Sequence, residues 1–244
     1  MFLLFNKAFN QLSQRNKLKK FADILRFPNV YENFHPLHPD LQNGERKELI
    51  MKGKWNSDHF KKDTKLCLEL ACGRGEYTLA LAEKYTDSHF IGLGIKGARI
   101  WQGAKHALDN NLDNVAFLRA RIESISSFFD KGEVDEMWIT FPDPFLRDSK
   151  ENRRLTSHNF LDRYLNFLKP QHQIHLKTDS PELYEFTLES LETYEKARVI
   201  EHYDDIYSLA ELPNPDLIFQ TYYERKHLAD KRTIKYVRFE LDID

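Results

Sequence analysis

From residue 66 to the end of the chain, short apolar runs alternate with longer segments in which apolar residues recur at helical spacing. The short runs predict seven strands, at residues 66–71, 89–93, 115–118, 134–141, 173–177, 197–202 and 234–241. The longer segments predict helices at residues 78–85, 95–108, 122–129, 157–168 and 181–194. Repeated β-α units place helices on both faces of a parallel sheet. We therefore predict an α/β protein with a doubly wound, mostly parallel, seven-stranded Rossmann-like sheet.

The two ends of this pattern differ from its middle. No helix precedes the strand at 234–241, so we expect it to enter antiparallel beside 197–202. Residues 1–55 contain three of the prolines and fit no sheet unit, so we expect an N-terminal basic arm or cap there. The domain that contains the predicted sheet would then occupy residues 56–244.

The composition limits the class of protein. With 41% hydrophobic residues among 244, the chain can bury one large core. No uncharged apolar run approaches membrane-spanning length, and no signal peptide is recognisable, so we expect a cytoplasmic protein, either a monomer or a homodimer. Cys67 and Cys72 lack metal or disulfide spacing, and the close histidine pairs have no other ligands nearby, so we expect no metal.

Basic residues are clustered although the net charge is -2. The clusters are Arg15, Lys17, Lys19, Lys20 and Arg26; Arg147, Lys150, Arg153 and Arg154; and Arg225, Lys226, Lys231, Arg232 and Lys235. A phosphate backbone responds to such local patches rather than to the net charge. A single cluster of this kind is more often a solvated face than a binding surface, but three clusters in one chain shift the balance toward binding.

A glycine-rich loop, residues 69–76, follows the first predicted strand. Gly73 and Gly75 allow a tight turn and a close approach to a ligand. The third glycine of a dinucleotide-binding loop is replaced by Thr78, which argues against a nicotinamide cofactor. Glu69, before the turn, suits a sulfonium or ammonium ligand better than a pyrophosphate, which favours S-adenosylmethionine. A plain tight turn is the alternative.

A second chemical centre is predicted where the strand at 134–141 ends in Phe141-Pro142-Asp143-Pro144. The two prolines stiffen the backbone around Asp143, so its carboxylate is held at the carboxyl edge of the sheet, where open α/β folds bind ligands. The alternative is a proline-flanked turn that only ends the strand.

Taken together and in order, these motifs resemble those of the bacterial tRNA (guanine-N7)-methyltransferases. The matching segments are the glycine loop, Phe141-Pro142-Asp143-Pro144, Arg153-Arg154-Leu155, Lys177-Thr178-Asp179 and Thr221-Tyr222-Tyr223-Glu224. The resemblance covers residue 16 to the end and implies a class I methyltransferase sheet. It implies S-adenosylmethionine as the methyl donor and N7 of a guanine in the tRNA variable loop as the acceptor.

The resemblance also implies roles for individual residues. The cofactor would be bound by Glu69, Gly73, Gly75, Gly94, Arg121 and Asp143, with Asp143 also catalytic. The substrate would be bound by Arg147, Arg153, Arg154, Asp179, Thr221, Tyr222, Tyr223 and Glu224. For Asp179, capping of the helix at Pro181 is an open alternative, and for the two tyrosines a place in the core is one.

Four positions depart from the family pattern. Glycine, as Gly94, replaces the acidic residue expected to hold the cofactor ribose, and Arg121 replaces a polar or acidic residue near the adenine. Phe145 and Leu146 replace a Trp-Pro pair, and Arg147 replaces a lysine. The loss at Gly94 keeps a second function open, a non-catalytic or weakly active RNA-binding protein on a degenerate methyltransferase fold. A small-molecule methyltransferase is disfavoured, because it would need neither a basic arm nor the double arginine Arg153-Arg154.

Overall fold

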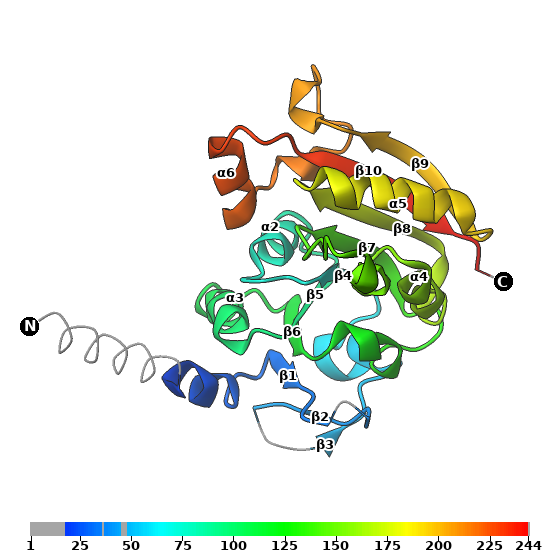
Figure 1. Cartoon of the computed structure of the whole chain (residues 1–244). Helices are drawn as coiled ribbons and strands as arrows, with labels where there is room; N and C mark the ends of the chain where they lie inside the picture. The colour runs from blue at the N-terminus through cyan, green and yellow to red at the C-terminus, as the bar shows by residue number, and fades with distance from the viewer. Residues whose placement is uncertain (1–17, 36, 45–47, 244) are drawn as a thin grey trace, which may run out of the picture.

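The computed structural model describes residues 18–35, 37–44 and 48–243, which include one mixed sheet of ten strands. The sheet runs from β3 at the bottom of Figure 1 to β9 at the top, in the order β3-β2-β1-β6-β5-β4-β7-β8-β10-β9. The strands are β1 Val30–Glu32, β2 Leu41–Gln42, β3 Glu48–Leu49, β4 Leu66–Leu70, β5 His89–Gly94, β6 Val115–Arg119, β7 Val134–Thr140, β8 Leu168–Thr178, β9 Ala197–Tyr203 and β10 Lys235–Leu241.

The seven predicted strands are confirmed, as β4 to β10. Within this part of the sheet β6, β5, β4, β7 and β8 are all parallel, and β10 is antiparallel to both β8 and β9. The predicted antiparallel entry of the last strand beside β9 is therefore confirmed. Because β4 lies between β5 and β7, the order of the strands reverses at β4, and loops leaving the sheet there diverge to opposite faces.

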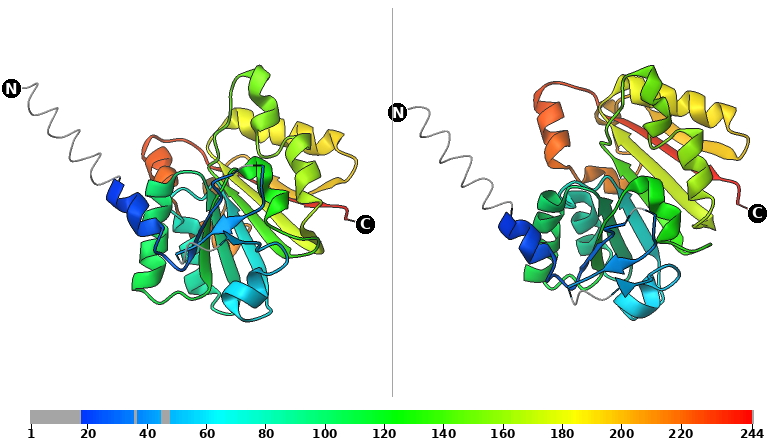
Figure 2. Two further views of the ribbon diagram at one scale, coloured as in Figure 1. Left: turned by 90° about the horizontal axis from the view of Figure 1, so that it is seen from below. Right: turned by 60° about the horizontal axis from the view of Figure 1, so that its bottom comes forward.

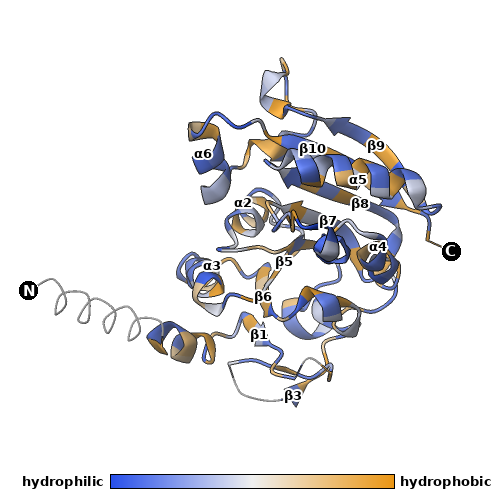
Figure 3. Cartoon of the chain, in the orientation of Figure 1, coloured by the Kyte–Doolittle hydropathy of each residue, from blue (hydrophilic) through white to orange (hydrophobic). Residues whose placement is uncertain are grey.

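Helices cover both faces of the sheet, as predicted. They are α2 Glu76–Lys84, α3 Gly97–Asp109, α4 His158–Tyr164, α5 Pro181–Thr193 and α6 Tyr222–Ala229, together with a π-helix at Trp55–Phe60 and 3-10 helices at Ile122–Ser127, Asp148–Arg153, Ile206–Ser208 and Pro215–Ile218. One buried cluster joins α2 and α3 to the sheet, and a second joins α4 and α5 to the opposite face. The buried central strands β5 and β6 are largely orange in Figure 3.

The N-terminal region differs from the expectation that it contributes nothing to the sheet. Three short strands extend the sheet beyond β6, with β1 parallel to β6 and β2 and β3 added antiparallel. Val30 and Tyr31 are buried there. A helix at residues 18–24 lies beside α3 (blue and green in Figure 2), and Asp23 accepts a hydrogen bond from Trp101. Arg15 and Lys17 lie outside the described residues.

Three further details differ from the sequence prediction. The helix expected at 157–168 ends at Tyr164, and β8 begins at Leu168 rather than at 173. The segment expected to be helical at 122–129 is a short 3-10 helix. Helix α6, which follows Thr221, was not predicted, and its polar sequence explains why no apolar stripe marked it. Every helix among the described residues is too short or too polar to cross a membrane.

Candidate active site

Two cavities meet at the carboxyl edge of the parallel strands. The first, of about 570 Å³, lies over the ends of β4, β5, β6 and β7, and the second, of about 690 Å³, lies between the end of β8 and α6. Both are lined by Arg99, Phe141 and Pro142, so these three residues form the boundary between them. Both volumes are in the range of about 300–1,000 Å³ that is typical of small-molecule sites.

The glycine loop lines the first cavity only in part. Ala71 and Gly73 both have left-handed backbones, with φ of 58° and 57°, and both line the cavity. A Cβ on Gly73 would approach only the Ala71 carbonyl, at 3.9 Å, so its backbone is open to a ligand. Gly75, at φ 71°, has another reason to be glycine, because a Cβ there would lie 2.4 Å from the ring of Phe117. Gly73 therefore faces the cavity, whereas Gly75 allows α2 to pack closely.

Glu69 is 3% exposed and is absent from the residues that line the first cavity. One carboxylate oxygen accepts a hydrogen bond from the Thr140 hydroxyl at 2.5 Å, and the other accepts from the amide and hydroxyl of Thr78. Burial raises the pKa of Glu69 to about 7, although these hydrogen bonds oppose the shift. Its carboxylate thus connects the start of α2 to the end of β7, directly before the Asp143 loop.

Gly94 and Arg121 both line the first cavity. A Cβ built on Gly94 would meet Cys72 Sγ at 3.5 Å and other atoms only at 3.9 Å or beyond, which is ordinary van der Waals contact. A Cβ could therefore be added at this position without displacing its neighbours. Arg121 is exposed at the beginning of the 3-10 helix Ile122–Ser127.

Asp143 lies in a backbone of unusual shape. Phe141 and Phe145, on either side of the Pro142-Asp143-Pro144 segment, have left-handed φ values of 48° and 44°, which bulky residues rarely adopt. The Phe141 amide donates to the carbonyl of Lys177 at 2.8 Å, and the Phe145 amide donates to Asp143 Oδ1 at 3.1 Å. Asp143 is exposed and lines the first cavity next to the boundary with the second.

The two neighbouring arginines occupy different environments. Arg153 is exposed, lies over the ring of Phe145 at 4.6 Å and lines the first cavity. Arg154 is 7% exposed and donates to the carbonyls of Pro144 and Phe145. The structure thus places Arg154 inside the loop and not at the surface expected for a tRNA contact. Arg147 is exposed at the start of the 3-10 helix Asp148–Arg153.

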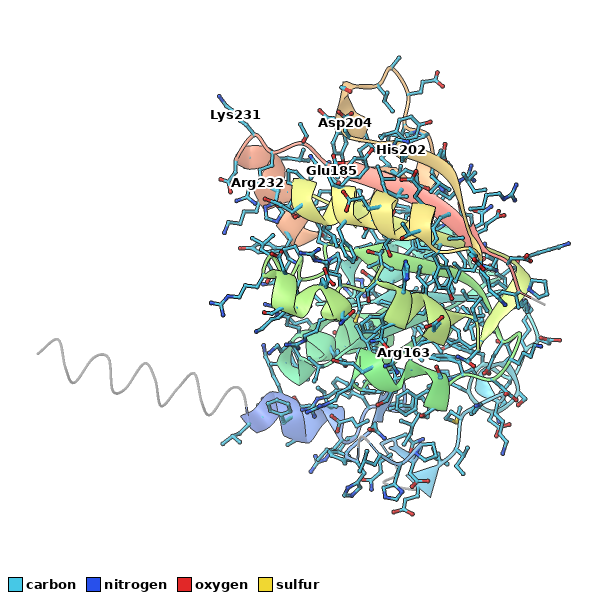
Figure 4. All side chains as sticks on the ribbon, turned by 45° about the vertical axis from the view of Figure 1, so that its right-hand side comes forward. Arg163, Glu185, His202, Asp204, Lys231 and Arg232 are labelled. Atoms are coloured by element: carbon cyan, nitrogen blue, oxygen red, sulfur yellow. The ribbon has the colours of Figure 1, made fainter. Side chains whose placement is uncertain are left out.

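The second cavity contains a charged cluster at its rim. Asp179 accepts a hydrogen bond from Arg232 at 2.8 Å and lies 3.4 Å from His227 Nδ1. Figure 4 shows Arg232 in the connection between α6 and β10. The His227 ring packs against the rings of Phe141 and Tyr223, with centroids 6.0 and 6.5 Å apart. The N-cap of α5 is Ser180, so Asp179 does not serve as that cap.

The Thr221-Tyr222-Tyr223-Glu224 motif begins α6. Thr221 caps the helix through the Glu224 amide. Tyr222 and Tyr223 are exposed and lie under the guanidinium groups of Arg74 and Arg99, at 4.5 and 5.4 Å. Glu224, in contrast, is fully buried and forms an ion pair with the buried Lys177 at 2.8 Å. The motif therefore combines a helix cap, two surface tyrosines and a buried charge.

Three residues of the site were not identified from the sequence. Arg99 separates the two cavities, His227 lines the second, and Lys177 holds α6. Lys177 belongs to the Lys177-Thr178-Asp179 motif, but β8 contains several other polar residues, so the sequence did not mark its burial. The spacing of Thr221 and Glu224 matches a helix capping box, a pattern that would have located α6 and hence His227. Nothing in the local sequence distinguishes Arg99.

The strand order, the antiparallel last strand and the cavity at the sheet edge define the fold of a class I methyltransferase. The 16S rRNA methyltransferase KamB has this fold, with a TM-score of 0.57 at 13% identity over 81% of this chain and 97% of that one. An antibiotic-related methyltransferase gives 0.56 at 17% identity, over 79% and 95% of the two chains.

The family follows from closer relatives. A family profile described as "Putative methyltransferase" matches residues 63–237. The tRNA (guanine-N(7)-)-methyltransferase of Christiangramia forsetii is 42% identical over 230 residues, covering 94% of this chain and 100% of that protein. Its namesake in Bacteroides thetaiotaomicron is 42% identical over 227 residues, covering 93% and 86%. The chain belongs to the tRNA (guanine-N(7)-)-methyltransferase family, as its motifs predicted.

The buried carboxyl group of Glu69 predicts a pH-dependent stability. Because its folded-state pKa is raised, its protonation stabilises the fold at low pH, and this contribution is lost as the pH rises through about 7. The free energy of unfolding of the wild type, relative to Glu69→Gln, should fall by about 3 kcal/mol between about pH 4 and pH 8. Denaturant unfolding of both proteins across this range measures it, and parallel curves would contradict it.

Proposed function

We propose that this protein transfers the methyl group of S-adenosylmethionine to N7 of a guanine in the tRNA variable loop. The observation that carries the proposal is the pair of adjoining cavities with Asp143 beside their boundary. A methyl donor in one cavity and a base in the other would meet where Phe141 and Pro142 separate them. The names of the relatives support guanine N7 in tRNA as the acceptor, and we infer that the enzyme acts in the cytoplasm.

The first cavity suits the cofactor. Its open backbone at Gly73 allows close approach of a ligand, and Gly94, Arg121 and Asp143 also line it. Glu69 would act on the cofactor indirectly, because its hydrogen bonds fix the loop that follows β4. S-adenosylmethionine supplies an electrophilic methyl group on a positively charged sulfur. Pro142 and Asp143 form the side of the cavity facing the second one, so the methyl group would be presented there.

The second cavity suits a flipped guanine. Its walls include the rings of Phe141, Tyr223 and His227, against which a base can stack. The Asp179 carboxylate can accept from the N–H groups of the guanine Watson–Crick edge, while Arg232 beside it can donate to the O6 acceptor. This combination leaves N7 unbound. To act as the nucleophile, N7 must have its lone pair free of hydrogen bonds.

The chemistry needs no general base, because guanine N7 has an exposed lone pair. The protein must align N7 with the methyl carbon and compensate the positive charge that moves from sulfur to the purine. Asp143 serves both purposes. The left-handed residues on either side of its segment and the hydrogen bond from Phe145 hold its carboxylate in place, and its negative charge favours the cationic product.

Exposed basic side chains around the two cavities suit a phosphate backbone. Arg121 and Arg153 line the first cavity, Arg232 lines the second, and Arg147 is exposed beyond the Asp143 loop. Arg74 and Arg99 lie over the exposed tyrosines of α6. The large RNA expected as substrate would contact this charged surface while one base enters the second cavity.

We predict that Asp143→Asn nearly abolishes methyl transfer without unfolding the protein. Loss of the charge that opposes the developing cation should cost at least about 1.5 kcal/mol, or about tenfold in rate. Purified protein is incubated with S-adenosylmethionine and unmodified tRNA, and 7-methylguanosine is quantified by mass spectrometry of the nucleosides.

Asp148→Asn is the matched control, because Asp148 is an exposed aspartate of the neighbouring 3-10 helix. It should remain within about twofold of wild type. If wild type forms no 7-methylguanosine on tRNA, the proposed function is wrong. If Asp143→Asn stays within about threefold of wild type, only the role of Asp143 is wrong.

Alanine substitutions of Arg153 and Arg154 should have different effects on tRNA binding. Arg153→Ala removes an exposed charge and should reduce the slope of log affinity for tRNA against log salt by about one unit. Arg154→Ala should leave that slope unchanged but lower the free energy of unfolding by about 1–3 kcal/mol, because two carbonyls of the Asp143 loop lose their donor. Salt titrations and denaturant unfolding of both variants measure this, and equal slopes for the two would contradict it.

Because position 94 is glycine, we predict that a substitution there can tighten cofactor binding. An aspartate there could accept hydrogen bonds from the cofactor ribose, and its Cβ has room. Gly94→Asp should therefore tighten binding of S-adenosylmethionine by about tenfold to a hundredfold without changing the modified base. Gly94→Asn, of the same shape without the charge, is the control. Calorimetry that gives equal or weaker affinity for Gly94→Asp would show that the ribose is held elsewhere.

A further inference from the structure

Lys177 and Glu224 form an ion pair in which both side chains are 0% exposed, with Nζ 2.8 Å from Oε1. Neither residue lines either cavity. The resemblance to the family implied that Glu224 contacts the substrate. A carboxylate with no exposed surface cannot touch a tRNA base unless α6 moves away from the sheet.

Lys177 connects three separate segments. Besides Glu224, its ammonium group donates to the carbonyls of Leu217 at 2.9 Å and Phe219 at 3.0 Å, which occupies its three donors. Its backbone carbonyl accepts the amide of Phe141, the first residue of the Asp143 loop. One residue at the end of β8 therefore fixes the segment before α6, α6 itself and the Asp143 loop.

Glu224 is equally enclosed. Its Oε1 also accepts a hydrogen bond from the Tyr207 hydroxyl at 2.8 Å, and its amide donates to Thr221. Its Oε2 is buried, with no hydrogen-bond donor among the described residues. The carboxylate is thus held through Oε1 alone, by partners that belong to the protein.

The residues of the ion pair are close along the chain to residues that line the second cavity. Asp179 is two residues after Lys177, Tyr223 is adjacent to Glu224, and His227 is three residues further along the same helix. All three line the second cavity. A displacement of the ion pair would change the spacing between Asp179 on one wall and the two α6 rings on the other.

We propose that the Lys177–Glu224 pair positions the walls of the second cavity, where the guanine would bind, and that Glu224 does not itself contact tRNA. This inference rests on the proposed function, because it assigns a role in the acceptor site of that reaction. Glu224 is then a positioning residue, which acts through α6. Loss of one partner leaves a buried charge uncompensated and displaces α6, whereas loss of both charges removes that cause.

The test compares Glu224→Gln with the double variant Lys177→Met/Glu224→Gln. Neither protein has the carboxylate, so they differ only in the buried lysine. In the double variant the glutamine amide keeps an oxygen that can accept from Tyr207, and methionine fills the space of the lysine stem without its charge. Steady-state methylation of tRNA, calorimetry with S-adenosylmethionine and thermal melting are measured for each.

Glu224→Gln should lose at least about tenfold in kcat/KM, mainly through a higher KM for tRNA, with cofactor affinity unchanged. The double variant should recover at least about fivefold over Glu224→Gln. Asp87→Asn, which breaks the exposed pair with Lys62, is the control and should match wild type. If Glu224→Gln does not fold, a double variant within about tenfold of wild type supports the proposal.

The proposal is overturned if Glu224→Gln is fully active, because the pair is then unnecessary. It is also overturned if the double variant fails to fold, or folds and binds S-adenosylmethionine but is no more active than Glu224→Gln. The last result would mean that the carboxylate itself is required at the substrate. Absence of tRNA methylation by wild type would instead refute the proposed function, so the two failures are distinguishable.

Discussion

The site depends on the parallel pairing of β4 with β7, at the point where the strand order reverses. Leu70 pairs with Ile139 there, so the glycine loop and the Asp143 loop leave the sheet from adjacent strand ends. A buried hydrogen bond from Thr140 to Glu69 reinforces this pairing where the two loops begin, and the bonds from Thr78 to Glu69 fix the start of α2 beside it. Both cavities adjoin the end of β7, so the backbone topology determines how the two cavities lie relative to each other.

Hydrophobic patterning predicted the central part of the fold because it reports burial on both faces of parallel strands. Hydrophobic patterning did not predict the helices and strands in which few residues are buried. Strands β1 to β3 have two or three residues each, too few for an alternating pattern, and they are held by pairing with β6 and with each other. Helix α6 buries only Glu224 and its cap, so hydropathy could not show it.

For the site, the sequence indicated which residues gather at the sheet edge but not how each is used. Arg153 and Arg154 are chemically identical neighbours, yet one faces a cavity and the other binds loop carbonyls. Glu69 and Glu224 belong to motifs that predicted ligand contacts, and both side chains are buried within the protein. These differences arise from the three-dimensional environment, which local sequence spacing does not encode.

The backbone conformation around Asp143 limits how the loop could be transferred to another protein. Its shape requires left-handed conformations at Phe141 and Phe145, each costing about 1–3 kcal/mol. Hydrogen bonds from outside the segment, to the carbonyl of Lys177 and from the side chain of Arg154, offset that cost. A synthetic peptide with the sequence of this loop would therefore not reproduce the geometry, and a graft onto another α/β scaffold would have to carry both anchors with it.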